Sequence, residues 1–156
     1  MTDYQPLPLT FERLWQFSLQ HYGVREIKEA CLHLQNQYNG KVNLVLLLKW
    51  LDEHQLSLSE QQWEQLDSAI ERTEGLLEQF RYYRRKAKPH LPDTLYRESL
   101  QFELQLERQQ QSDLVHCINQ MTLSDKVTTP MTHVYCQELG ATHLCDIFFN
   151  TKKSEK

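Results

Sequence analysis

The segment from Val42 to Leu51 constrains the fold of this chain more than any other part of it. Only Asn43 and Lys49 interrupt the apolar run. The run is about half as long as a helix that crosses a bilayer, which needs roughly 20 apolar residues. A helix that is apolar on almost every side has to be surrounded by other elements. The sequence therefore predicts a buried central helix at about residues 43–54.

The composition of the rest of the chain favours helices. The 156 residues include only four glycines and five prolines, and good helix formers such as leucine, glutamine and glutamate are abundant. A chain of this length can bury enough surface to form one self-supporting core. The sequence predicts an all-α fold in which five to seven helices pack around the central one. This single domain is expected at 10–149, after an extended lead-in at 1–9 and before a disordered tail at 150–156.

Cap and turn residues predict two long helices in the second half of the chain. Ser59 opens a capping-box pattern, and the prolines of segment 89–92 force a turn, so helices are expected at about 60–87 and 94–121. The second of them contains a stretch at 107–113 that is polar on all sides. Because a helix without an apolar face has little reason to pack, this stretch is predicted to leave the body, fray or bind a partner.

Three smaller features complete the expected element order. Gly40 follows an amphipathic segment and is predicted to adopt the left-handed conformation that ends a helix. Thr129 and Pro130 are predicted to be the N-cap and the first residue of a short helix that ends at Gly140. For residues 143–149 a short helix and an extended segment both remain open.

Several function classes find no support in the sequence. The first residues have neither the basic nor the apolar region of an export signal, so we expect a cytoplasmic location, no membrane contact and four reduced cysteines. Phosphate-binding glycine loops, nucleophile elbows and zinc-protease motifs do not occur. The sequence thus predicts no catalytic residue and no cofactor, and it favours a non-enzymatic interaction or regulatory protein.

A set of motifs spread over residues 10–115 resembles a known family. The set consists of Leu14-Trp15-x-Phe17-Ser18, Cys31-Leu32-x-Leu34-Gln35, Val42-Asn43-Leu44-x-Leu46-Leu47, Trp63 and Arg81-x-x-Arg84-Arg85-x-x-Lys88. It is similar to a proteobacterial family of conserved hypothetical proteins that is catalogued as a domain of unknown function. The resemblance implies a bacterial, cytosolic, helical protein, and it brings no activity, cofactor or catalytic residue.

The segment from Arg81 to Lys88 is the only local concentration of one charge. It holds five cations and no acidic residue, although the net charge of the chain is -4. On a helix, Arg81, Arg84, Arg85 and Lys88 recur at offsets that share a face, and Tyr82 lies beside them. We therefore predict these five residues as the candidate binding surface for a partner or an anion.

This candidate surface has three interpretations that the sequence leaves open. An acidic protein partner is the preferred functional one. A nucleic acid or phosphorylated ligand is the second, although a single short patch makes few phosphate contacts. In the third, the cations complement the end of the helix dipole and form ion pairs with Glu98, Glu103 and Glu107 of the next helix. A small-ligand-binding or enzymatic protein with a pocket that the sequence does not reveal is a separate alternative.

Four residues near the C-terminus are weak candidates for a metal site. His133, Cys136, His143 and Cys145 are residue types that bind zinc, and they lie within 13 positions of each other. Their spacing differs from that of common zinc fingers, and a free cysteine is usually a small buried apolar residue. The sequence therefore predicts that no metal is bound here.

Overall fold

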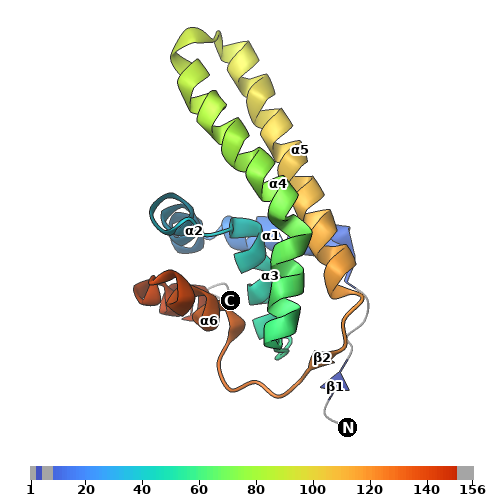
Figure 1. The fold of residues 1–156 in the computed structure, drawn as a ribbon. Helices are drawn as coiled ribbons and strands as arrows, with labels where there is room; N and C mark the ends of the chain where they lie inside the picture. The colour runs from blue at the N-terminus through green and yellow to red at the C-terminus, as the bar shows by residue number, and fades with distance from the viewer. Residues whose placement is uncertain (1–2, 5–8, 151–156) are drawn as a thin grey trace.

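The computed structural model describes residues 3–4 and 9–150, and it has the all-α fold predicted from the sequence (Figure 1). Two short strands, β1 (Asp3–Tyr4) and β2 (Leu123–Ser124), pair in antiparallel register. No helix in the described part of the chain combines the length and apolar character required to span a bilayer. The helices are α1 (Phe11–Tyr22), α2 (Arg25–Tyr38), α3 (Val42–Glu53), α4 (Glu60–Ala87), α5 (Asp93–Ile118), α6 (Met131–Leu139) and α7 (Cys145–Asn150), with 3-10 turns at Lys88–His90 and Thr142–Leu144.

Helix α3 is the central helix that the apolar run predicts. Every residue from Asn43 to Leu51 is buried, and the helix packs against α1, α2, α5 and α6. Its one buried cation, Lys49, donates a hydrogen bond to the carbonyl oxygen of Phe148 in α7 and lies 3.8 Å from the Glu53 carboxylate. A buried ammonium group is tolerated only when it is paired in this way. Lys49 therefore ties α7 to the centre of the fold.

Helices α4 and α5 form a long antiparallel hairpin whose outer half projects beyond the other helices (Figure 1). The predicted capping box at Ser59 is present and opens α4. Helix α5 ends three residues earlier than the predicted residue 121. At its end the Asn119 side chain exchanges two hydrogen bonds with the backbone of Leu9, at 3.1 and 2.6 Å. This exchange holds the segment before α1 against the C-terminal end of the hairpin.

The prediction for Gly40 is wrong in its conformation but identifies a position at which glycine is required. Asn39, with a φ of 59°, adopts the left-handed conformation that ends α2. Gly40 instead lies against Leu34, since a Cβ atom at this position would come within 2.6 Å of the leucine Cγ. Asparagine is the residue other than glycine that most readily adopts this backbone conformation.

The start of α6 also differs from the prediction. Pro130 is the N-cap residue rather than the first helical residue, and it has no side chain with which to cap the helix. Asp52 of α3 takes over this role, because its carboxylate accepts hydrogen bonds from the backbone N–H groups of Met131 and Thr132, at 2.6 and 3.1 Å. Burial nevertheless raises the pKa of Asp52, an effect that these hydrogen bonds oppose. A carboxylate from the central helix thus fixes the position of α6.

The C-terminal part resolves the alternative that the sequence leaves open. Residues 142–144 form a 3-10 turn and Cys145–Asn150 form α7, so this part is helical rather than extended. The Phe148 side chain is buried in the core. The first residue of the predicted disordered tail, Asn150, belongs to α7, and the rest of the tail lies outside the described residues. The predicted lead-in also lies outside them, except for residues 3, 4 and 9.

Candidate functional site

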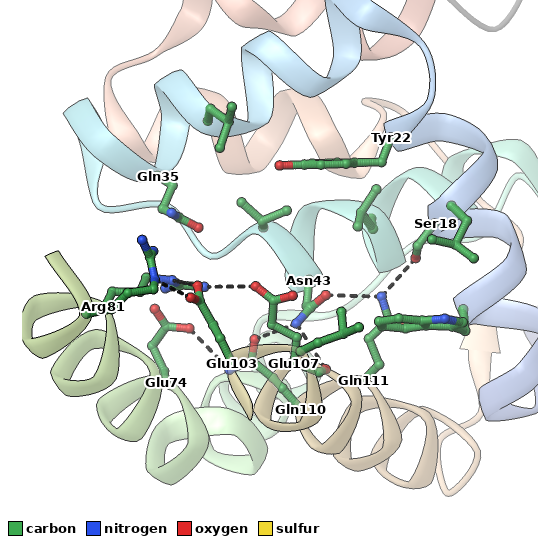
Figure 2. A pocket seen from close by; sticks show the side chains of 17 residues that line it. Ser18, Tyr22, Gln35, Asn43, Glu74, Arg81, Glu103, Glu107, Gln110 and Gln111 are labelled. Carbon is green, nitrogen blue, oxygen red and sulfur yellow. Dashed lines mark hydrogen bonds and ion pairs between the residues drawn. The ribbon is translucent and has the colours of Figure 1, made fainter. Parts of the chain in front are cut away.

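A cavity of about 280 Å³ lies between the projecting hairpin and helices α1, α2 and α3 (Figure 2). Its volume is close to the lower end of the range for small-molecule sites. One wall is largely apolar and is formed by side chains of the first three helices. The opposite wall, formed by α4 and α5, is strongly polar. The apolar residues that line the cavity are Trp15, Leu19, Leu32, Val42, Leu46 and Leu104.

The polar stretch 107–113 contributes two buried residues to this site, which corrects the prediction that it leaves the body or frays. Gln110 and Gln111 are each only 1% exposed. Both face the inside of the fold, and Glu107 of the same stretch lines the cavity with them. The stretch packs because polar residues of other helices meet it, and no apolar face is needed for this contact.

A chain of side-chain amides joins α1, α3 and α5 along the cavity (Figure 2). The Gln111 amide nitrogen donates hydrogen bonds to the Ser18 hydroxyl, at 2.8 Å, and to the Asn43 amide oxygen, at 3.0 Å. Asn43 in turn donates to the Gln110 amide oxygen at 2.9 Å. Buried amides without partners would cost about 1 to 3 kcal/mol each, so these bonds are required at this depth.

The amide chain continues onto α4 and is incomplete at its other end. The Gln110 amide nitrogen donates to the Thr73 hydroxyl and to the Glu74 carboxylate, both at 3.2 Å. The amide oxygen of Gln111 is buried and accepts no hydrogen bond from the described residues. Buried acceptors without a donor are rare in folded proteins.

Two of the predicted surface arginines belong to the polar wall instead of the surface. The Glu103 carboxylate lies between them, 3.2 Å from Arg81 Nε and 2.6 Å from Arg84 Nε. Arg81 also lies 3.5 Å from the Glu107 carboxylate. Arg81 is 8% exposed, and its pairs with Glu103 and Glu107 are among those expected in the third interpretation of the cation patch. Glu98, the other glutamate expected to pair, makes no ion pair with a described residue.

The other members of the predicted surface stay at the outside of the hairpin. Arg85 and Lys88 are exposed, and Tyr82 is 56% exposed. The Lys88 ammonium lies over the Tyr96 ring at 5.2 Å, and the Lys86 ammonium lies over the Tyr82 ring at 5.4 Å. The structure therefore divides the predicted surface into two arginines at the cavity, of which Arg81 is buried and Arg84 half-buried, and an exposed group near the tip.

The carboxylates of the polar wall are incompletely neutralised. Burial raises the pKa of Glu107, and the nearby Arg81 only partly offsets this effect. Glu74 accepts the Gln110 hydrogen bond and makes no ion pair with a described residue. Across the cavity, burial raises the pKa of Tyr22 to about 12, with smaller contributions from Cys31, Glu107 and Glu103 that Arg81 partly opposes. The carboxylates that line the cavity outnumber its guanidinium groups by three to two.

Two polar side chains from the other helices also line the cavity. Tyr22 of α1 and Gln35 of α2 extend into the cavity from the side opposite the hairpin (Figure 2). Neither the Tyr22 hydroxyl nor the Gln35 amide makes a hydrogen bond to a described residue. Both are therefore available to a molecule that enters the cavity.

The four metal candidates do not form a shared site. Cys136 and Cys145 are buried next to one another, and burial raises the pKa of Cys136 to about 12. The His143 ring is directed at α2, where it lies 5.8 Å from both the His33 and Tyr38 rings. Within the part of the chain that the structure describes, no three His, Cys, Asp or Glu side chains are arranged to hold a metal ion.

Comparison with known proteins gives one match. A family model described as "Protein of unknown function (DUF2390)" matches residues 13–114, which extend from α1 to the last turn of α5. This region supplies all of the residues that line the cavity. No curated protein and no solved structure matches the chain.

Proposed function

We propose that this chain, which belongs to the DUF2390 family of proteins of unknown function, is a non-enzymatic protein that binds a small organic molecule in this cavity. The observation that carries the proposal is the contrast between the two walls, one apolar and one built from buried amides and ion pairs. A bacterial origin and a cytoplasmic location stay predictions from the sequence.

The cost of building the polar wall supports a binding role. Burying charged groups does not by itself stabilise a fold, because the loss of hydration offsets much of the attraction between them. An apolar filling of the same space would serve folding equally well. A cavity that combines an apolar wall with a few convergent polar groups is instead the usual form of a ligand site. The amide chain also holds these polar groups in fixed positions before any ligand enters.

The proposal can be tested by filling the cavity. We expect Leu104→Trp to place an indole ring in the cavity and to abolish the thermal stabilisation that small organic molecules from a screening library give the native protein. Leu106→Trp is the matched control, because Leu106 lies two residues further along α5, is also half-buried, and lines a groove on another face of the hairpin. The molecules that stabilise the native protein should also stabilise Leu106→Trp, since a ligand stabilises a protein only through the site that it binds.

The result that would contradict the proposal is equally specific. Stabilisation by library molecules that survives in Leu104→Trp, or that is lost equally in Leu106→Trp, would mean that the cavity is not the binding site. Circular dichroism of both variants has to show that each remains helical.

A second candidate function follows from the exposed group near the hairpin tip. Tyr82 and Tyr83 are 56% and 64% exposed, and the exposed cations Arg85 and Lys88 follow within six residues on a part of the hairpin that projects from the body. Exposed aromatic rings next to cations form a favourable surface for an acidic partner protein. We propose this interaction role as an addition to ligand binding and not as a replacement for it.

Photo-crosslinking tests the second candidate. A photoreactive residue in place of Tyr83 should capture a protein partner in the native host, whereas one in place of the exposed Arg72, lower on α4, should not. The double change Arg85→Glu with Lys88→Glu should reduce the capture, since it reverses the charge that attracts the partner. Equal capture from both positions would contradict a specific surface, and a captured nucleic acid would favour the phosphate-binding alternative.

A further inference from the structure

We propose that the ligand of the cavity is an organic cation with an apolar body, such as a protonated amine that carries an aromatic or alkyl group. This inference rests on the proposed binding function and adds the charge and shape of the ligand to it. It comes from the balance of charged groups in the polar wall and from where these groups lie.

The charges that line the cavity do not balance. The lining contains the carboxylates of Glu74, Glu103 and Glu107 but only the two guanidinium groups of Arg81 and Arg84. Both arginines are already bonded to Glu103, so this carboxylate is fully compensated. The excess negative charge therefore lies on Glu74 and Glu107. An anionic ligand would add to this excess beside partly buried carboxylates, whereas a cation would reduce it.

Three acceptors of the polar wall point to the same class of ligand. Glu74 receives a hydrogen bond only from a neutral amide, and Glu107 receives one from Arg81 at a long 3.5 Å. The Gln111 amide oxygen at this wall is a buried acceptor without a donor. Each of these three groups is an acceptor that has too few hydrogen-bond donors around it. A protonated amine supplies three N–H donors and no acceptor, and thus complements them.

The other half of the cavity determines the shape of the ligand body. Trp15, Leu19 and Leu32 lie on the apolar wall, and the last two are 53% and 38% exposed although they are large apolar residues. Two exposed leucines at a cavity lined by a tryptophan give an aromatic or alkyl group a surface to cover. The volume of about 280 Å³ limits this body to a single small ring or a short chain.

Three matched probes separate the charge of the ligand from its shape. The probes are 2-phenylethylammonium, 2-phenylethanol and 3-phenylpropanoate, which share a phenyl ring on a short chain and differ in charge. Binding of each to the full chain is measured by calorimetry at neutral pH and low salt. We expect the cation to bind about tenfold or more tightly than the alcohol, and the carboxylate to bind most weakly.

Glutamine variants connect the charge preference to the polar wall. Glu107→Gln and, separately, Glu74→Gln should each weaken binding of the cation by about tenfold while leaving binding of the alcohol within about twofold. Glu98→Gln is the control, because Glu98 is an exposed residue of the same helix α5 and does not line the cavity. It should change neither affinity. Two separate variants keep the test valid if one of them folds poorly.

The possible outcomes distinguish this inference from the function on which it rests. If the alcohol or the carboxylate binds as tightly as the cation, and Leu104→Trp abolishes that binding, the cavity binds ligands but the inferred charge is wrong. If none of the three probes binds, or if Leu104→Trp leaves binding unchanged, the inference and the binding function both fail. A tenfold preference for the cation that is unchanged in Glu107→Gln and Glu74→Gln would also overturn the assignment of the charge to these carboxylates.

Discussion

Replacement of Leu47 by alanine should lower the free energy of unfolding by about 2 to 5 kcal/mol. Leu47 lies in the middle of α3 and is completely buried. Removing its side chain takes away apolar surface that is buried on folding and leaves a void that the surrounding helices fill only in part. Urea denaturation followed by circular dichroism measures the effect, as a lower midpoint with an unchanged slope.

Two other leucines serve as controls for Leu47. Leu46→Ala should cost less than Leu47→Ala, because Leu46 borders the cavity and so has fewer packed neighbours to lose. Leu19→Ala should alter stability by less than about 0.5 kcal/mol, since Leu19 is 53% exposed. A Leu47→Ala protein as stable as the native one would mean that α3 is not the centre of the core.

The central helix could be predicted because its sequence pattern admits one physical solution. An apolar run too short for a bilayer and too uniform for a surface helix has to be enclosed by other helices. The long hairpin could be predicted for a similar reason, since a capping box at Ser59 and the prolines of segment 89–92 define the ends of its first helix. These are local signals, and local sequence carries them completely.

The cavity could not be predicted, because its polar wall depends on contacts between residues far apart in the chain. Gln111 is buried by bonds to Ser18 and Asn43, which lie 93 and 68 residues away. Within a helix, three successive glutamines have the pattern of a solvated face. One signal was available, since Ser18 and Asn43 are polar residues at positions that the apolar pattern assigns to the core. Such residues need buried partners, and a search for them would have led to the glutamines.

The positions of the cations in the predicted binding surface also could not be predicted from the sequence. Sequence spacing places Arg81 and Arg85 on one helix face, yet the first is buried and the second is exposed. The difference arises because α5 packs along only part of this face and brings Glu103 to Arg81. The local pattern cannot distinguish a surface of four free cations from an arrangement in which Arg81 and Arg84 pair with Glu103.

Replacement of Arg81 by methionine distinguishes a buried ion pair from a surface cation. Replacing a surface arginine would lower the free energy of unfolding by less than about 0.5 kcal/mol. For Arg81→Met we expect the free energy of unfolding to fall by about 3 kcal/mol at neutral pH. This value is at the lower end of the range for breaking a buried ion pair, because Arg84 remains bonded to Glu103. The loss arises mainly from the Glu107 carboxylate, which stays half-buried without the cation that compensates it. Arg85→Met, one turn further along α4 and exposed, is the matched control and should be nearly neutral.

The pH dependence of the Arg81→Met variant tests this explanation directly. Burial already raises the pKa of Glu107, and Arg81 opposes that rise, so its removal should raise the pKa further. A carboxyl group whose pKa is raised by folding stabilises the fold most when it is protonated, and this contribution is lost as the pH rises through its folded pKa. The stability difference between the native protein and Arg81→Met should therefore shrink as the pH falls toward about 4. Adding Glu107→Gln should restore part of the lost stability at neutral pH, because it removes the uncompensated charge. A deficit that is the same at pH 4 and pH 7 would mean that Arg81 contributes through the packing of its carbon chain rather than through charge.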